Sequence, residues 1–365
     1  MKILVSSLSR DFGGVESLFL SLAQSVSRDD LEMDFVCTDS SAAREDDFVA
    51  CGAAIHHIER PSRNLWKYIK SFYTLLRTGG YDVYHVNLTR FRFPLDIVIA
   101  KFCGIKVVLH CHATRIYDVG NRKVRIIREF EQVLFRPVSL GCSSLNLACS
   151  ENAGKYLFGS HVFRIIHNGI DLSRFLYTPT AREKIRKELD LDGKKVIGHI
   201  GRFSQEKNHV FLLKVLKALL KIDSEYRLLC VGSGDLFDRI CDLAGEEGLD
   251  KKVVFTGQRQ DTPDLLSAMD VFVFPSVHEA LPITLIEAQA NGLPCIVSDC
   301  ITNEMDVIDS FRRLSLNVPV EIWADIIHEY ENKRKTTMDP ASFADFNIEL
   351  MKETLQNIYK GLCNY

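Results

Sequence analysis

Short apolar runs alternate with amphipathic stretches along the whole chain. The runs are rich in Val, Ile and Phe, as buried strands of parallel sheets are, and the stretches between them are long enough for crossover helices. This alternation predicts βαβ units on parallel sheets and therefore an α/β fold.

The pattern occurs twice. In the first half of the chain the predicted strands are Lys2–Leu8, Met33–Thr38, Ala54–Ile58, Asp82–Leu88, Lys106–His112, Leu145–Ser150 and Arg164–His167. In the second half they are Val196–Gly201, Arg227–Val231, Val253–Thr256, Val271–Pro275 and Pro294–Ser298, with helices at 208–221, 235–247 and 283–291. Two doubly wound parallel-sheet domains are the simplest architecture with this pattern.

A charge-dense stretch, TPTAREKIRKELDLDGKK, lies between the two series and is typical of a boundary helix and linker. We therefore expect a first domain at 1–176 and a second at 177–340. After Asp339-Pro340, which has the form of an N-cap and a first-turn proline, FNIELMKETLQNIYKGL has helical apolar spacing. This spacing predicts a terminal helix.

Length and composition narrow the class of protein. The 365 residues suggest two domains, and 46% hydrophobic with 25% charged residues is ordinary for a globular protein, which excludes disordered, collagen-like and coiled-coil chains. Forty-five basic and 48 acidic residues give a net charge of −3. The chain lacks the cationic excess of nucleic-acid binders, so we expect no nucleic-acid partner.

The cysteines and the start of the chain indicate the cellular compartment of the protein. There are 11 cysteines, an odd number with no C-x-x-C pair, and the opening MKILVSSLSRDFGG has no long apolar core. We expect reduced thiols and a cytoplasmic protein. Neighbouring side chains of His110-Cys111-His112 alternate between the faces of a strand, so no metal site is predicted there. No charge-free apolar run reaches the ~18 residues that a bilayer span requires.

Open parallel sheets bind ligands at the carboxyl ends of their strands. Gly13-Gly14 follow the first strand and precede a helix, where backbone amides and the helix dipole suit a phosphate. A plain tight turn is the alternative. Without G-x-G-x-x-G, a nicotinamide or flavin cofactor is not supported.

Two loops of the second half carry further candidates. After the strand Val196–Gly201, Arg202 and Lys207 enter a helix and could share one anion, such as a leaving diphosphate; the alternative is two solvated charges, one of them paired with Glu206. After Val271–Pro275, an E-x7-E pair places one carboxylate in the turn and the other on a helix, where they suit sugar hydroxyls and a ribose diol. The alternative is a helix-start acid and a solvated face residue.

These motifs together resemble one enzyme family. Gly13-Gly14, G-R-x4-K-N, VGSGD, Glu279-x7-Glu287 and GLPCIVSD occur in order, with HNGIDLSRF and IGHIGRFSQEKNHVFLL between them. The collinear match covers nearly the whole chain. It resembles the retaining GT-B glycosyltransferases of family four, especially enzymes of bacterial capsule and exopolysaccharide synthesis. The resemblance implies two Rossmann-like domains facing a cleft, with the helix of 341–365 packing back on the first domain.

The resemblance also implies a donor, a nucleotide diphosphate sugar, with UDP expected and GDP open. Arg202 and Lys207 would bind its phosphates, Glu279 its sugar hydroxyls and Glu287 its ribose. The remaining implied contacts are the loop glycine Gly201, the amides of Ala280 and Leu281 near the phosphates, the backbone of Gly257-Gln258-Arg259 near the base, Gly13 and Gly14 of the first domain, and His112 near the transferred sugar.

Breaking a glycosyl–phosphate bond creates an oxocarbenium-like sugar and an anionic leaving group, which positioned cations and helix ends stabilise without a metal. We therefore expect neither metal nor cofactor, and name no catalytic base. One departure is Ala280, where the family usually has glycine: a positive φ there would strain the loop by roughly 1–2 kcal/mol and weaken donor binding. A GT-B sugar-nucleotide epimerase and a non-catalytic partner subunit are the alternative functions.

The acceptor side is indicated by 115–136, which has six basic residues against three acidic ones. Its apolar residues Val124, Ile127, Phe130 and Leu134 have helical spacing. We expect this segment to lie against anionic lipid and to position a saccharide or lipid-linked acceptor, which makes the protein peripheral on the inner membrane face. A helix packed on its own sheet is the alternative.

Overall fold

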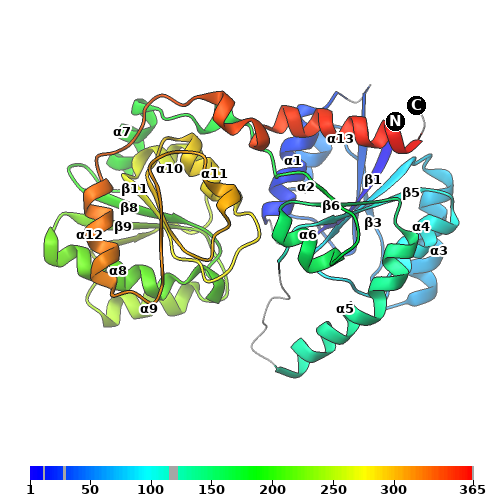
Figure 1. Cartoon of the computed structure of the whole chain (residues 1–365), viewed down its shortest axis with the longest axis horizontal. Coiled ribbons are helices and arrows are strands. Elements are labelled where there is room, and N and C mark those ends of the chain that lie inside the picture. Colours follow the sequence, from blue (N-terminus) through cyan, green and yellow to red (C-terminus); the bar gives the residue numbers. More distant parts are fainter. Residues whose placement is uncertain (11–12, 28–29, 115–121, 364–365) are drawn as a thin grey trace. The chain divides into compact units, whose positions relative to one another are not determined.

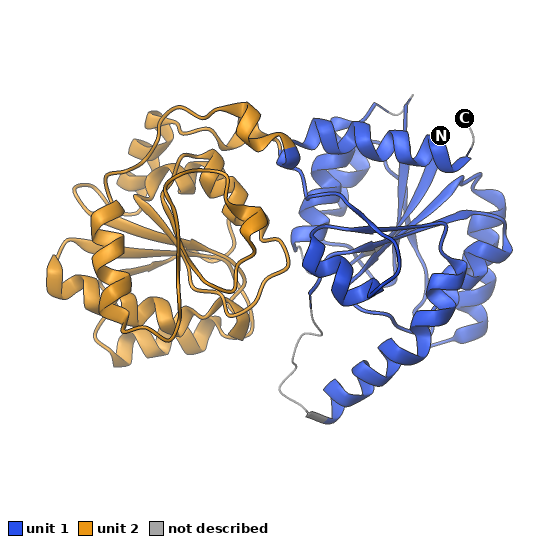
Figure 2. Cartoon of the chain, viewed as in Figure 1, with its two compact units in different colours: residues 1–170, 345–365 blue, residues 171–344 orange. Residues whose placement is uncertain are grey.

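The structure is a computed structural model that describes residues 1–10, 13–27, 30–114 and 122–363. It divides into two compact units, residues 1–170 with 345–365 (unit 1) and residues 171–344 (unit 2) (Figure 2). Each unit has a parallel sheet covered by helices, so the α/β prediction is confirmed.

Unit 1 contains a seven-stranded parallel sheet in the order β3-β2-β1-β4-β5-β6-β7 (Figure 1). Its strands are β1 (Lys2–Leu8), β2 (Glu32–Cys37), β3 (Ile55–His57), β4 (Val83–Leu88), β5 (Lys106–Cys111), β6 (Leu145–Ala148) and β7 (Arg164–Ile165). Its helices are α1 (Gly14–Ser25), α2 (Glu45–Ala50), α3 (Leu65–Thr78), α4 (Leu95–Phe102), α5 (Arg122–Cys142), α6 (Glu151–Phe158) and α13 (Ile348–Cys363). Because parallel crossovers are right-handed, α1 and α2 cover one face and α3 to α6 the other.

Unit 2 contains a six-stranded sheet in the order β10-β9-β8-β11-β12-β13. Its strands are β8 (Lys195–Ile200), β9 (Tyr226–Val231), β10 (Val253–Phe255), β11 (Val271–Phe274), β12 (Cys295–Ser298) and β13 (Phe311–Leu314). Its α-helices are α7 (Pro179–Glu188), α8 (His209–Ile222), α9 (Phe237–Glu246), α10 (Thr262–Ala268), α11 (Ile283–Ala290) and α12 (Val320–Tyr330), and its 3₁₀ helices include η1 (Leu172–Phe175) and η2 (Gln205–Lys207).

Every predicted strand is present, with ends that differ by two residues or fewer. The pattern missed β13, whose sequence FRRL has two arginines and lies at the edge of the sheet. The terminal helix begins later than predicted. Asp339-Pro340 start a 3₁₀ helix, η4 (Pro340–Phe346), and α13 begins after Asn347, whose Oδ1 accepts a hydrogen bond from Glu349 N at 2.9 Å.

The units also divide at different residues from those predicted. Unit 2 begins at Asp171 rather than at residue 177, because η1 packs into it: Leu172 and Phe175 are buried, and Asn291 Nδ2 donates to Phe175 O at 2.9 Å. The chain re-enters unit 1 near Asp345, where Ile170 N donates to Phe346 O and Ile348 N donates to Ile170 O. Helix α13 then packs on α1, and Tyr359 Oη lies 2.7 Å from His85 Nδ1.

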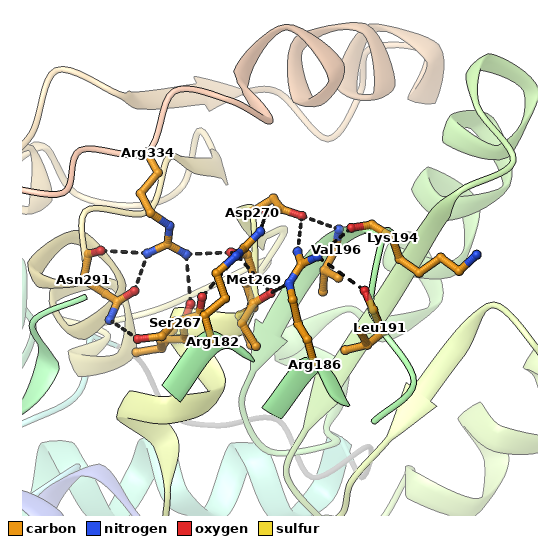
Figure 3. A network of polar contacts seen from close by, with 12 residues as sticks. Arg182, Arg186, Leu191, Lys194, Val196, Ser267, Met269, Asp270, Asn291 and Arg334 are labelled. Atoms are coloured by element: carbon orange, nitrogen blue, oxygen red, sulfur yellow. Dashed lines mark hydrogen bonds and ion pairs between the residues drawn. The ribbon is translucent and has the colours of Figure 1, made fainter. Parts of the chain in front are cut away.

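A buried polar network holds the boundary helix α7 to the sheet of unit 2 (Figure 3). Asp270, just before β11, accepts hydrogen bonds from Arg182 at 2.5 Å, Arg186 at 2.6 Å and the backbone of Val196 at 2.7 Å. Arg334 donates to Met269 O at 2.6 Å and to Leu266 O at 3.1 Å. These groups lie at the amino ends of β8 and β11, so the network supports the edge of the sheet opposite to the one where ligands bind.

Among the described residues, no helix has the length and apolar character needed to cross a bilayer. All 11 cysteines are free thiols.

Candidate functional site

The strand order of each sheet reverses at one point. In unit 1 the reversal lies between β1 and β4, and in unit 2 between β8 and β11. The loops that leave the carboxyl ends of these strands open a crevice for ligands in folds of this type. The candidate residues lie on these loops, and each unit is described by itself.

In unit 2 the loop after β8 meets the loop after β11. Lys207 Nζ lies 2.7 Å from Glu279 Oε1, and the two side chains are 17% and 14% exposed. Lys207 Nζ also lies 4.6 Å from the centre of the Phe274 ring. Lys207 therefore pairs with Glu279 rather than with Glu206, and the structure brings together two of the residues that the sequence singled out.

Backbone contacts fix the positions of these two loops. Val277 N donates to Glu206 O at 2.8 Å, and Asn208 Nδ2 donates to Pro275 O at 3.2 Å. Asn208 itself has φ 56°, a left-handed conformation that asparagine tolerates better than most residues. This explains the asparagine of the G-R-x4-K-N motif.

The glycines of VGSGD allow the loop after β9 to approach the loop after β8. A Cβ on Gly232 would lie 2.1 Å from Gly201 O, and a Cβ on Gly234 would lie 2.6 Å from Phe203 O. Both glycines have positive φ, 140° and 152°. The motif is therefore a packing requirement that holds Gly201 and Arg202 in place.

The start of α11 offers unpaired polar groups. In the described part of the chain, no acceptor pairs with the backbone N–H of Ala280 or Leu281, and both residues are buried. Ser276 Oγ and Thr284 Oγ1, which flank them, are also buried without a hydrogen-bond partner among these residues. A helix start with free donors suits an anion. The sequence analysis missed Ser276 and Thr284, although Ser276 directly follows a predicted strand.

Ala280 does not have a positive φ, since only Arg44, Asp190 and Asn208 do so among the described residues other than glycine. The strain expected from alanine in place of the usual glycine is therefore absent. The condition under which alanine would strain this loop is not met.

Glu287 lies on α11 and is only 9% exposed. Burial raises the pKa of its carboxyl group to about 7, an effect that nearby Arg174 of η1 partly offsets. A carboxyl group with this pKa in a buried position has the character of a functional residue rather than of a solvated surface charge.

Two further candidates differ in their surroundings. Arg202 is exposed and forms no ion pair with the residues that the structure describes, so its guanidinium can reach a ligand. The Arg259 side chain instead donates to Asp261 at 2.6 Å and 2.8 Å and to Glu188 at 2.6 Å. Its guanidinium therefore links the loop after β10 to the carboxyl end of α7.

Beneath Lys207 lie two histidines that the sequence analysis did not single out. His199 Nδ1 lies 2.9 Å from Val273 O, and its ring is 4.8 Å from that of His209. Burial lowers the pKa of His209 to about 4 and that of His199 well below its ordinary value. Both are neutral at pH 7, so they add no positive charge beside Lys207.

In unit 1 the glycine pair after β1 lies at the start of α1, and a side chain of that helix already binds one of its backbone amides. Gly13 N donates to Glu16 Oε2 at 3.1 Å, and Ser9 Oγ donates to Glu16 Oε1 at 2.8 Å. The N–H of Gly13 is therefore already used, which argues against its role as a phosphate donor. Glu16 stands three residues after the N-cap, the capping-box spacing, and this signal was available in the sequence. Gly14 N has no acceptor among the described residues.

His112 follows β5 and is 8% exposed. Its Nε2 lies 3.1 Å from Asn87 Oδ1, while Asn87 Nδ2 donates to Ser6 O at 3.4 Å. Because a backbone oxygen orients the Asn87 amide, we assign the hydrogen of His112 to Nε2; its Nδ1 is buried, and the side chain of Asn168 lies beside the ring. Burial lowers the pKa of His112 to about 4.

No group of three or more His, Cys, Asp or Glu side chains among the described residues is arranged to hold a metal ion. The predicted roles of the individual residues stay predictions, because the geometry locates side chains without showing a ligand.

Two family models match the chain, one to each half. Residues 12–174 match the model described as Glycosyltransferase Family 4, and residues 181–343 match Glycosyl transferases group 1.

Curated relatives match over most of their length. The putative glycosyltransferase EpsF of Bacillus subtilis is 31% identical over 327 residues, which are 86% of this chain and 84% of the relative. An Escherichia coli UDP-Gal:α-D-GlcNAc-diphosphoundecaprenol α-1,3-galactosyltransferase is 25% identical, covering 82% and 79%. The capsular polysaccharide biosynthesis glycosyltransferase CapH of Staphylococcus aureus is 26% identical, covering 95% of each chain.

Among solved structures, HepE of Anabaena in complex with UDP has a TM-score of 0.78 at 17% identity, covering 99% of this chain and 100% of that one. This likeness shows the fold. The predicted family and fold are confirmed: the chain is a glycosyltransferase with the GT-B fold and belongs to glycosyltransferase family 4, the group 1 glycosyl transferases.

Proposed function

We propose that this glycosyltransferase moves a hexose or N-acetylhexosamine from a UDP-sugar to a saccharide or lipid-linked saccharide acceptor in capsule, exopolysaccharide or other cell-surface polysaccharide synthesis. Three likenesses support the proposal. By its name the E. coli relative uses UDP-Gal and a diphosphoundecaprenol-linked acceptor, and the S. aureus relative acts in capsular polysaccharide synthesis. HepE has been crystallised with UDP and with UDP-glucose.

The observation that carries the proposal is the cluster of Lys207, Glu279 and the free amides at the start of α11. A diphosphate brings negative charge that Lys207 Nζ and the N–H groups of Ala280 and Leu281 would receive. The exposed guanidinium of Arg202 would add a two-pronged contact to the phosphate oxygens.

The other residues would bind the rest of the donor. Glu279 would accept a hydrogen bond from a sugar hydroxyl while keeping its ion pair with Lys207, and Glu287 would hold the ribose diol. From unit 1, Gly14 N–H would donate to a phosphate oxygen. The Nδ1 atom of His112 would accept a hydrogen bond from a hydroxyl of the transferred sugar.

We propose retention of configuration from the resemblance to the retaining enzymes of family four, and the groups above would assist the step. As the glycosyl–phosphate bond breaks, positive charge develops on the sugar ring and negative charge on the diphosphate. Arg202, Lys207 and the helix start stabilise that negative charge in place of a metal ion. The acceptor hydroxyl then attacks from the face that the diphosphate leaves, and a departing phosphate oxygen takes its proton, so no side chain is assigned as base.

Calorimetric titration tests the donor site. We expect UDP to bind the wild type, and Lys207→Met to weaken binding and to lower transfer about 100-fold, the typical effect of removing one donor to developing charge. Lys214→Met, on the exposed side of α8, is the matched control. Tight binding of GDP and not of UDP would show that the donor is a GDP-sugar rather than a UDP-sugar. Equal binding by the wild type and Lys207→Met would contradict the site.

Product analysis tests the reaction. A lipid-linked or oligosaccharide acceptor is supplied with UDP-sugars, and the anomeric proton of the product is followed by NMR. We expect transfer with retention that survives excess EDTA. Donor conversion without an acceptor would identify an epimerase, no conversion with any donor would identify a partner subunit, and loss of activity in EDTA would contradict metal independence.

A further inference from the structure

Exposed aromatic side chains gather in one part of unit 1. Among the described residues, every Phe, Trp or Tyr classed as exposed lies between residues 66 and 130. They are Trp66 at 80%, Tyr73 at 40%, Phe93 at 56%, Phe102 at 81% and Phe130 at 65%. Exposed aromatic groups are costly in water unless a partner covers them, so their concentration marks an interaction surface.

These side chains come from neighbouring helices. Helix α3 packs against α4 and α4 against α5, and α5 projects outward from the unit (Figure 1). The rings of Tyr73 and Phe102 are 6.5 Å apart, and those of Phe93 and Phe135 are 5.5 Å apart. We call the outer surface of α3, α4 and α5, with the loop that carries Phe93, the α3–α5 face.

Helix α5 adds an apolar stripe. Ile126, Ile127, Phe130, Val133, Leu134 and Val138 have helical spacing and are between 45% and 73% exposed. An apolar stripe this exposed is not packed on its own sheet, so that alternative for the segment 115–136 is wrong for its described part. Residues 115–121 lie outside the described residues.

The same region is strongly basic. The segments that form this face, residues 65–78, 92–102 and 122–142, contain 10 Lys and Arg against three Asp and Glu, a net charge of +7 in a chain whose net charge is −3. Lys70 and Arg77 on α3 and Lys101 on α4 are exposed beside the aromatic residues. The sequence analysis saw only the part of this excess that lies in 115–136. The larger part precedes it and becomes visible once α3 and α4 are placed beside α5.

We propose that the α3–α5 face binds an anionic lipid bilayer. Trp and Phe insert at the headgroup level, an aliphatic stripe enters the acyl boundary, and lysines and arginines attract anionic headgroups. A nucleic acid would use the charge but would leave the stripe of Ile, Val and Leu uncovered. The rest of the chain, at −10 by difference, would also repel a polyanion. A protein partner would not need a charge of this size.

Vesicle sedimentation tests the inference without any sugar chemistry. Wild-type protein is mixed with vesicles of phosphatidylcholine alone or with 30% phosphatidylglycerol, in about 0.1 M salt, where the Debye length is about 10 Å. We expect binding only to the anionic vesicles. In Lys70→Ser/Arg77→Ser/Lys101→Ser, binding should fall about 100-fold, because each basic residue near an anionic surface contributes about fivefold.

A second variant separates insertion from attraction. Trp66→Ser/Phe102→Ser keeps every charge, and we expect it to lose at least tenfold in binding and to lose the blue shift of Trp66 fluorescence on anionic vesicles. The matched controls are Lys187→Ser/Lys214→Ser/Lys251→Ser, three exposed lysines of unit 2, and Val162→Ser, an 87% exposed residue of unit 1. Both controls should bind as the wild type does.

Three outcomes would overturn the inference. The first is equal vesicle binding by the wild type and both test variants. The second is that the wild type does not bind vesicles but forms a dimer, and that Trp66→Ser/Phe102→Ser is monomeric. The third is that the protein binds a nucleic acid and does not bind vesicles. UDP titration on the same samples keeps this result separate from the donor-site proposal, because neither test variant changes a residue of that site.

Discussion

Gly201 leaves the space that the Lys207 side chain fills. A Cβ at residue 201 would lie 3.3 Å from Lys207 Cδ and Cε and 3.1 Å from His199 Nε2. Residue 201 does not have a positive φ, so alanine would meet a side-chain conflict and no backbone strain. We predict that Gly201→Ala moves Lys207 away from Glu279 and weakens UDP binding about tenfold, with an overpacking cost of about 1–3 kcal/mol in unfolding free energy.

Calorimetry and urea denaturation measure these two effects. Gly257→Ala is the contrasting variant, since its positive φ of 68° costs backbone strain while nothing lies within 4 Å of the new Cβ. It should lose stability and leave Lys207 in place. Unchanged UDP affinity in Gly201→Ala would show that Lys207 does not meet the diphosphate.

Glu287 makes a prediction about pH. Its pKa is raised to about 7 in the folded protein. The folded state therefore holds its proton more tightly than the unfolded state, so the stability contribution is present below pH ~4.5 and is lost as pH rises through 7. In Glu287→Gln no proton can be lost. The thermal midpoint of this variant should match the wild type at pH 5 and exceed it at pH 8.

The same variant separates stability from function. If the Glu287 carboxylate holds the ribose, Glu287→Gln should bind UDP at least tenfold more weakly at pH 8, despite its higher thermal midpoint. Glu304→Gln, outside α11 in the same unit, is the control for a charge change. A midpoint difference between Glu287→Gln and the wild type that does not grow with pH would contradict a raised pKa.

At the residue scale the sequence singled out residues that the structure brings together, but it did not show all of their partners. The E-x7-E spacing and the glycine pair are local patterns, so Glu279, Glu287 and Gly14 could be found from them. Arg259 also pairs with Glu188, and this contact depends on where α7 packs, which no local pattern states.

At the scale of elements, periodicity was sufficient wherever a strand is buried on both faces. The pattern did not predict strand β13, because its two central residues are Arg312 and Arg313. The strand lies at the edge of the sheet and pairs, among the described strands, only with β12, and charged side chains are common on edge strands. The start of α13 was misplaced because Asn347 pairs with Ile170, a contact between residues far apart in the sequence.

Helix α7 depends on one carboxylate (Figure 3). Asp270 accepts from Arg182, Arg186 and the backbone of Val196, all within 2.7 Å. We predict that Asp270→Asn destabilises unit 2 by about 3–5 kcal/mol, because it leaves two partly buried guanidinium groups without their counter-ion. Urea denaturation measures the loss.

Asp264→Asn is the matched control for this prediction. Asp264 also pairs with α7, through Lys184 at 3.6 Å, but both side chains are more than a third exposed. A solvent-screened pair of this kind contributes about 0–1 kcal/mol. Equal losses in the two variants would mean that the Asp270 network contributes no more than an ordinary surface pair.

At the scale of the whole molecule, the two-domain fold followed from the sequence because each series of strands is complete in itself. The segments at the boundaries did not follow. Leu172 and Phe175 are apolar and precede the charge-dense stretch, so the composition assigned them to the first domain, whereas their burial places them in unit 2. The composition shows where the charge-dense stretch begins along the chain, but it does not show on which unit a short helix packs.

Both units carry buried neutral histidines, and this makes a prediction for the whole chain. Burial lowers the pKa of His85 to about 3 and those of His112 and His209 to about 4, while His110 and His199 lie well below their ordinary value. Below pH ~6.5 the unfolded chain takes up protons that the folded chain does not. The contribution of these histidines to stability should therefore be full above pH 6.5 and be lost in both units as pH drops toward 4.

His209 allows a test at one site. Both of its ring nitrogens are buried without partners among the described residues, and its ring stacks on Phe203 at 3.9 Å, so leucine keeps the apolar packing and removes the proton. In a Trp66→Phe background Trp323 is the remaining tryptophan and reports on unit 2. His209→Leu should gain about 3 kcal/mol relative to its parent between pH 7 and pH 4. Parallel pH profiles for His209→Leu and its parent would show that His209 is protonated as readily in the folded chain as in the unfolded one.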